Sequence, residues 1–64
     1  MHNPHFEIIL KQSLHEKKSV GIYLNGHVLA GVVYQLTETT VFLRNREYAQ
    51  IVIGLNQILA IVMH

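Results

Sequence analysis

The last apolar run of the chain, residues 58–63, carries no polar side chain on either face. A strand of this kind has to be covered on both faces. The chain has only 64 residues, of which half are hydrophobic and 14% are charged. A domain this small buries only about 60% of its unfolded surface, and it has no cysteine to crosslink it. We therefore expect this strand to pair with another copy of the chain. The alternative is a strand covered by the chain's own helix.

One helix is predicted near the start of the chain, over residues 4–17. Asn3 and Pro4 suit the N-cap and the first helical position. The apolar residues that follow recur at helical spacing; they are Phe6, Ile9, Leu10 and Leu14. Glu7 and Lys11 stand four residues apart in the order that favours an ion pair, and the two lysines that end the segment suit the helix dipole.

From residue 20 onward the hydrophobic pattern changes to a period of two, which is typical of half-buried strands. Asn25-Gly26 predicts a tight hairpin turn, and Gly31 predicts a bend or a close backbone approach within a strand. The predicted strands are residues 20–25, 27–36, 39–44, 48–53 and 58–63. Residues 1–64 are thus expected to form one mostly β domain, in which a helix precedes a five-stranded, strongly bent antiparallel small barrel.

Two segments carry a family resemblance. Residues 20–31 read VGIYLNGHVLAG, an apolar alternation that leads into Asn-Gly and then Leu-x-Gly, and residues 41–45 read VFLRN. With the helix and the remaining strands, they resemble the Sm-like (Lsm) family, and within it the bacterial Hfq branch, over essentially the whole chain. The resemblance implies a homo-oligomeric ring of six or seven subunits, in which the fourth strand of one subunit pairs with the fifth strand of the next.

The resemblance also implies single-stranded RNA as the ligand, and a role as an RNA chaperone or adaptor in post-transcriptional regulation. Tyr23 matches the tyrosine on which Hfq stacks adenine, with Gly26, His27 and Leu29 at neighbouring positions, so that A-rich RNA is the expected target. From the residues alone, packing at a subunit boundary is favoured over base stacking for Tyr23. The start of the chain has no signal-peptide pattern, so we expect a cytoplasmic protein.

Two further regions correspond to Hfq surfaces. The resemblance implies a basic rim for RNA, formed by His15, Lys17, Lys18, Arg44 and Arg46; the alternative is a set of solvated charges. Around the implied central pore stand Glu38, Thr39 and Asn56. Hfq has an aromatic residue, a lysine and a histidine in these stretches for uridine, and this chain has none of the three there. The resemblance therefore does not extend to uridine recognition.

Little in the sequence points to catalysis. Cysteine and aspartate are absent, serine occurs only as Ser13 and Ser19, and no glycine-rich phosphate loop is present. We expect no enzyme and no cofactor. His2 and His5 are too few ligands for a metal site, and no apolar run approaches the ~18 residues of a membrane span.

The charge balance leaves a second hypothesis open. The formal net charge is only +1, whereas an independent nucleic-acid binder is usually strongly basic. A ring-forming scaffold or protein-interaction module without Hfq-type RNA binding is therefore the alternative function.

Overall fold

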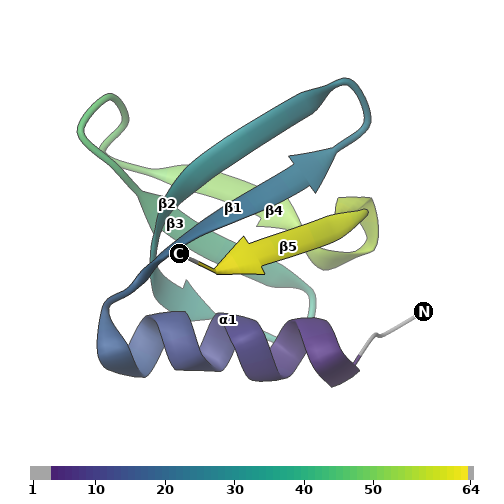
Figure 1. Ribbon diagram of the computed structural model, residues 1–64, viewed down its shortest axis with the longest axis horizontal. Helices are drawn as coiled ribbons and strands as arrows, with labels where there is room; N and C mark the ends of the chain where they lie inside the picture. Colours follow the sequence, from purple (N-terminus) through teal and green to yellow (C-terminus); the bar gives the residue numbers. More distant parts are fainter. Residues whose placement is uncertain (1–3, 64) are drawn as a thin grey trace.

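The computed structural model describes residues 4–63, which form one helix and five strands. The elements are α1 (Pro4–Glu16), β1 (Ser19–Leu24), β2 (His27–Leu36), β3 (Thr40–Arg44), β4 (Ile51–Gly54), the short 3₁₀ helix η1 (Leu55–Gln57) and β5 (Ala60–Met63). The strands form one antiparallel sheet in the order β4-β3-β2-β1-β5. Figure 1 shows α1 lying beneath this sheet, close to β5. The predicted order of one helix followed by a five-stranded antiparallel sheet is confirmed, and this arrangement is consistent with the Sm-like fold.

Helix α1 begins at the predicted residue and ends one residue before the predicted boundary of 17. Lys17 has a φ of 58°, the left-handed conformation that commonly follows a helix. Its N–H still donates to the Ser13 carbonyl oxygen at 2.8 Å. The predicted ion pair is present, because Lys11 Nζ lies 3.6 Å from a Glu7 carboxylate oxygen. Asn3, the predicted N-cap, lies outside the described residues.

β3 begins one residue later than predicted, at Thr40, and two strands begin two or three residues later, each because a local structure precedes it. β4 begins at Ile51 instead of residue 48, since the Asn45 side chain holds the preceding residues in a turn. β5 begins at Ala60 instead of residue 58, since η1 occupies the chain just before it. Ile58 itself leads out of η1 and is buried in the core.

The middle of β2 departs from a regular strand at two places. A Cβ atom built on Gly31 would lie 2.7 Å from the carbonyl oxygen of Arg44, so that only glycine fits beside β3. This close approach is one of the two outcomes predicted for Gly31. The pairing register between β2 and β3 then shifts between Val33 and Gln35, as in a β-bulge.

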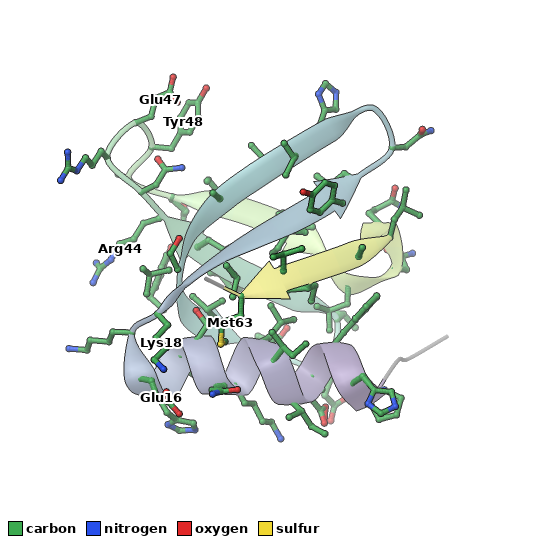
Figure 2. The ribbon with its side chains drawn as sticks, in the orientation of Figure 1. Glu16, Lys18, Arg44, Glu47, Tyr48 and Met63 are labelled. Atoms are coloured by element: carbon green, nitrogen blue, oxygen red, sulfur yellow. The ribbon has the colours of Figure 1, made fainter. Side chains whose placement is uncertain are left out.

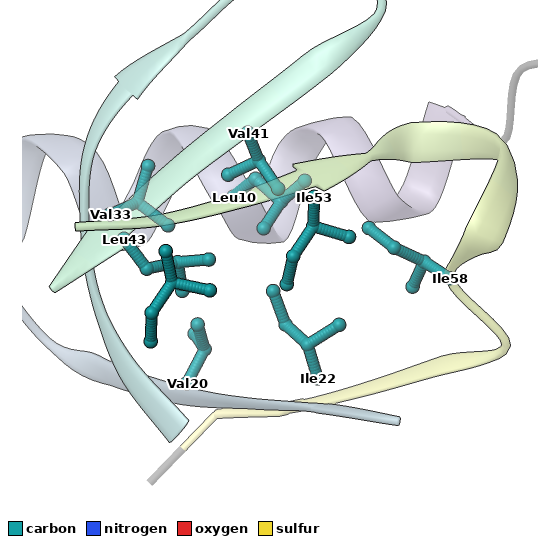
Figure 3. Close-up of a cluster of buried hydrophobic side chains, with 9 residues drawn as sticks. Leu10, Val20, Ile22, Val33, Val41, Leu43, Ile53 and Ile58 are labelled. Carbon is teal, nitrogen blue, oxygen red and sulfur yellow. The ribbon is translucent and has the colours of Figure 1, made fainter. Parts of the chain in front are cut away.

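The core lies between α1 and the inner side of the sheet. Figure 3 shows the cluster, which joins one helical leucine to apolar residues of β1, β2, β3 and β4 and of the segment after η1. Its members are Leu10, Val20, Ile22, Val33, Val41, Leu43, Ile51, Ile53 and Ile58. Partly buried side chains, including Phe6, Leu14 and Leu29, pack around them.

A buried serine joins α1 to the sheet. Ser13 is fully buried, and its Oγ accepts a hydrogen bond from the Val33 N–H at 3.2 Å and donates to the Lys18 carbonyl oxygen at 2.5 Å. Ser13 faces Val33 where the β1–β2 ladder ends, since Ser19 at the start of β1 pairs with Val32. One hydroxyl therefore forms hydrogen bonds with the Val33 N–H in β2 and with the Lys18 carbonyl just before β1.

We predict that Ser13→Ala destabilises the fold by about 1–3 kcal/mol, because it removes the partner of a buried N–H and of a partly buried carbonyl. Urea unfolding measures this loss. Ser19→Ala is the matched control, since Ser19 is only half-buried and should shift stability by no more than about 0.5 kcal/mol. Equal effects of the two substitutions would contradict the role given to Ser13.

Candidate nucleic-acid interface

Tyr23 lies on the side of the sheet opposite to the core, which we call the outer face. It alternates along β1 with the buried Ile22, and 45% of its surface is exposed. Its cross-strand partners are Val28 on β2 and Ala60 on β5. The next row of the outer face consists of Ala30, Gly21 and Val62. An exposed aromatic ring flanked by small and apolar side chains is the kind of surface on which a base stacks.

The other residues assigned to this face by resemblance do not share Tyr23's side of the sheet. Leu29 pairs with the buried Ile22 and packs against the core. His27 pairs with Leu24, and strand alternation gives it the same side as Leu29. Gly26 lies in the hairpin turn with a φ of 79°. The residues beside Tyr23 are therefore Val28 and Ala60, which the family resemblance did not identify.

The predicted rim residues gather at one end of the sheet. Lys17 and Lys18 connect α1 to β1, and Arg44 ends β3. The register joins these ends, because Ser19 pairs with Val32 and Val32 with Arg44. Figure 2 shows Lys18, Arg44 and Glu16 at this end of the molecule. We call it the basic end; its members are His15, Lys17, Lys18, Arg44 and Arg46, all exposed.

Two carboxylates, those of Glu16 and Glu47, reduce the net positive charge of the basic end. Lys18 Nζ lies 3.2 Å from a Glu16 carboxylate oxygen, in an ion pair whose side chains are both about half exposed. Glu47 directly follows Arg46 in the turn after β3. Exposed ion pairs of this kind are weak, so phosphate oxygens can replace the carboxylate as partners of Lys18.

Arg44 is held by an aromatic group that the sequence pattern did not reveal as part of the site. Its guanidinium carbon lies 5.3 Å from the centre of the Tyr34 ring, within cation–π range. The Tyr34 ring also packs at a tilt against Phe42, with centroids 6.1 Å apart. The Tyr34 hydroxyl accepts a hydrogen bond from Gln50 Nε2 at 2.9 Å. Arg44 is thus oriented on the outer face of β2 and β3.

Asn45 organises the turn that follows Arg44. Its Nδ2 donates to the Ala30 carbonyl oxygen at 2.7 Å. Its Oδ1 accepts hydrogen bonds from the N–H groups of Glu47 and Tyr48, at 2.8 and 2.7 Å. The turn that carries Arg46 is therefore tied to β2 by one side chain.

The three predicted pore residues also come together, at the other end of β3. The Leu55 N–H donates to the Thr39 carbonyl oxygen at 2.9 Å, which joins the β2–β3 turn to η1. Thr37 Oγ1 accepts hydrogen bonds from the N–H groups of Thr39 and Thr40. Glu38, Thr39 and Asn56 are exposed. Glu38 makes this end unfavourable for phosphate.

The two edge strands carry exposed apolar side chains. Within residues 4–63, β4 pairs only with β3 and β5 only with β1. Val52 on β4 is 56% exposed, Val62 on β5 is 45% exposed, and Leu59 just before β5 is 67% exposed. Edge strands with apolar side chains are ready templates for pairing with another chain.

Neither a metal centre nor a membrane span is found in the described part of the chain. Residues 4–63 contain no group of three potential metal-ligating side chains and no helix long and apolar enough to cross a membrane. Of the two histidines considered for a metal, His2 lies outside the described residues. The Ser13 hydroxyl is buried, and it is engaged in hydrogen bonds with the Val33 N–H and the Lys18 carbonyl.

No protein-family model matches this chain, and no curated protein sequence matches it either.

We predict that Asn45→Ala loosens the turn that carries Arg46. Three hydrogen bonds are lost. The fold should lose about 1–2 kcal/mol, which is less than three bonds of about 0.5–1.5 kcal/mol each would give, because the groups are exposed and water replaces the lost partners. Amide exchange at Glu47 and Tyr48 should accelerate. Asn56→Ala, the same substitution at an exposed position, is the control, and unchanged exchange in Asn45→Ala would refute this role.

Proposed function

We propose that this chain is an Sm-like, single-stranded RNA-binding protein that assembles as a homo-oligomeric ring of six or seven subunits. The observation that carries the proposal is the pair of unpartnered apolar edges, β4 and β5, at opposite sides of one sheet. A contact between two different surfaces of the same chain repeats head to tail and closes into a ring where the rotation allows. Pairing β4 of one copy with β5 of the next uses both edges of every copy.

The curvature needed for such a ring is supported by the middle of β2. Gly31 permits the close approach of β3, and the bulge at Val33–Gln35 follows it. Bulges increase local twist and bend a strand. The five strands are therefore proposed to form a small, strongly bent barrel.

RNA binding is proposed for the outer face and the basic end. Tyr23 offers an exposed ring for an adenine base, and Lys17, Lys18 and Arg44 offer cations for phosphates. Phosphate contacts position the strand while base contacts specify it. Each subunit contributes a weak site, and repetition around the ring raises the overall affinity. The protein then acts in the cytoplasm as an RNA chaperone or adaptor, with a preference for A-rich RNA.

A ring-forming scaffold without RNA binding is the second candidate. It is favoured by the outer face, because β1, β2 and β5 contain no lysine, arginine, aspartate or glutamate. Glu38 at the implied pore also favours the scaffold, because its exposed carboxylate repels phosphate. Binding measurements with RNA separate the two candidates.

We predict that wild-type protein sediments at six or seven times the 7.3 kDa of one chain. Leu59→Asp and Val52→Asp, one for each edge, should both abolish the ring, because an unpartnered charge buried at the contact costs several kcal/mol. Both side chains are exposed in the single chain, so each variant should still fold. Ile8→Asp on α1, which is also exposed at 62%, is the control that should keep the ring.

Mixing the two edge variants tests whether the contact joins different edges. A Val52→Asp chain keeps an intact β5, and a Leu59→Asp chain keeps an intact β4, so crosslinking of the mixture should give dimers of one chain of each kind and nothing larger. A stable wild-type monomer at micromolar concentration would overturn the ring, and rings that survive both substitutions would overturn the assignment of its contact.

We predict that Tyr23→Ala weakens binding of an A-rich oligonucleotide by about 1–3 kcal/mol per occupied site, which is the usual contribution of a stacked base. Arg44→Gln should weaken A-rich and U-rich binding alike and reduce the salt dependence by about one unit of slope. Asn56→Ala should change U-rich binding little. Fluorescence anisotropy over a series of salt concentrations measures all three.

The same titrations decide between the two candidate functions. Absence of salt-dependent binding to either oligonucleotide, with the ring intact, would favour the scaffold. A preference for U-rich RNA that is lost in Asn56→Ala would show that the pore end, and not the outer face, holds the ligand.

A further inference from the structure

Arg44 combines a positive charge with a planar group that an aromatic ring already covers on one side. Its guanidinium carbon lies 5.3 Å from the centre of the Tyr34 ring, and Arg44 is exposed. Figure 2 shows its side chain extending away from the sheet at the basic end. A guanidinium stacks on aromatic groups through its faces, while its five N–H donors lie at its edges. The side turned away from Tyr34 is therefore open to a second aromatic group.

The Tyr34 ring is itself held in place by two neighbours. It packs at a tilt against Phe42, with ring centroids 6.1 Å apart, and its hydroxyl accepts a hydrogen bond from Gln50 Nε2 at 2.9 Å. Tyr34 and Phe42 are both half-buried. A long exposed side chain such as that of Arg44 ordinarily loses much rotamer freedom when a ligand binds. The fixed ring reduces this loss, because it restricts the guanidinium before the ligand arrives.

The charge of Arg44 is also available to a ligand. Within residues 4–63, the ion pairs join Lys11 to Glu7 and Lys18 to Glu16, so that no carboxylate is paired with Arg44 there. A nucleotide offers partners for both parts of a guanidinium. Its base can stack on the open side, and its phosphate oxygens can accept hydrogen bonds from the N–H groups at the edge.

We infer that Arg44, backed by the Tyr34 ring, is a second base-stacking site for single-stranded RNA. One base covers the open side of the guanidinium, and the N–H donors at its edge bind an adjoining phosphate. Every base has a flat face, so this site adds affinity without sequence preference. The inference rests on the proposed RNA binding. It does not rest on the ring, because one chain holds Arg44, Tyr34 and Tyr23.

The two stacking sites lie on the same face of the sheet. Val28 of β2 is the partner of Tyr23, and Val32 of β2 is the partner of Arg44. Positions 28 and 32 share one side of the strand, and four residues of a strand span roughly 13 Å. A short stretch of RNA can therefore contact both stacking sites of one subunit.

The test measures how much of the affinity depends on the bases. A short oligoadenylate is compared with an abasic ribose-phosphate chain of the same length and charge, and the ratio of the two affinities is the base dependence. Arg44→Lys should lower this ratio about fivefold or more, as expected for the loss of one stacked base. The salt slope should stay unchanged, because lysine keeps the charge but lacks the planar group.

Two further substitutions separate the ring from the charge. Tyr34→Leu should also lower the ratio, whereas Tyr34→Phe, which keeps the ring, should leave it unchanged. Lys17→Gln is the matched control at the basic end. It should reduce the salt slope by about one unit and leave the ratio unchanged. Circular dichroism checks the fold of each variant, and Arg44→Lys changes only an exposed side chain.

The outcomes separate this site from RNA binding as a whole. An unchanged ratio in Arg44→Lys would overturn base stacking there and leave Arg44 as a phosphate partner, with RNA binding intact. A ratio that falls in Arg44→Lys but not in Tyr34→Leu would overturn the positioning role of the Tyr34 ring. Wild-type protein that binds neither oligonucleotide would overturn both this site and the proposed RNA binding.

Discussion

The pairing of β1 with β2 on one side and β5 on the other determines both edges of the sheet and the composition of its outer face. Val20 and Ile22 of β1 are fully buried, and the contact with the β5 side begins before the strand, where the Leu59 N–H donates to the Tyr23 carbonyl oxygen at 2.8 Å. Because β5 occupies this place beside β1, three strands separate it from β4. The two apolar edges therefore stay apart, and Tyr23 is flanked on both sides.

Three polar or glycine positions fix the basic end. The Ser13 hydroxyl joins α1 to β2, Gly31 admits the Arg44 carbonyl, and Asn45 Nδ2 reaches the Ala30 carbonyl. Each contact joins segments far apart in the chain at the same end of the sheet. These contacts fix the backbone segments that bear Lys17, Lys18 and Arg44. The Tyr34 ring further orients the Arg44 side chain.

The helix, the hairpin turn and the five strands follow from periodicity and turn residues, whereas the detail of the site depends on irregularities that periodicity does not encode. Continuing the register of Leu36 with Val41 without a bulge would set Tyr34 opposite Leu43, on the core side. The observed shift pairs Val33 with Leu43 instead, which leaves Tyr34 free to contact Arg44. The start of β4 also depends on a side chain, because Asn45 binds the N–H groups of Glu47 and Tyr48 and holds them in a turn. The hydrophobic pattern does not reveal this, since nothing in it distinguishes residues 48–50 from a strand.

In the proposed RNA complex, the charges at the two ends of β3 act independently of each other. A strand of five residues spans roughly 16 Å, while the Debye length at physiological ionic strength is about 8 Å. Arg44 ends β3, and Glu38 lies in the turn before its start, so attraction at one end is little weakened by repulsion at the other. The proposed RNA backbone is thereby favoured at the basic end over the end that holds Glu38 and Asn56. Tyr23 lies beyond the Arg44 end of β3, because its partner Val28 precedes Val32, the partner of Arg44, along β2. In the proposed complex, RNA held at the basic end therefore reaches the Tyr23 ring without crossing the end that holds Glu38.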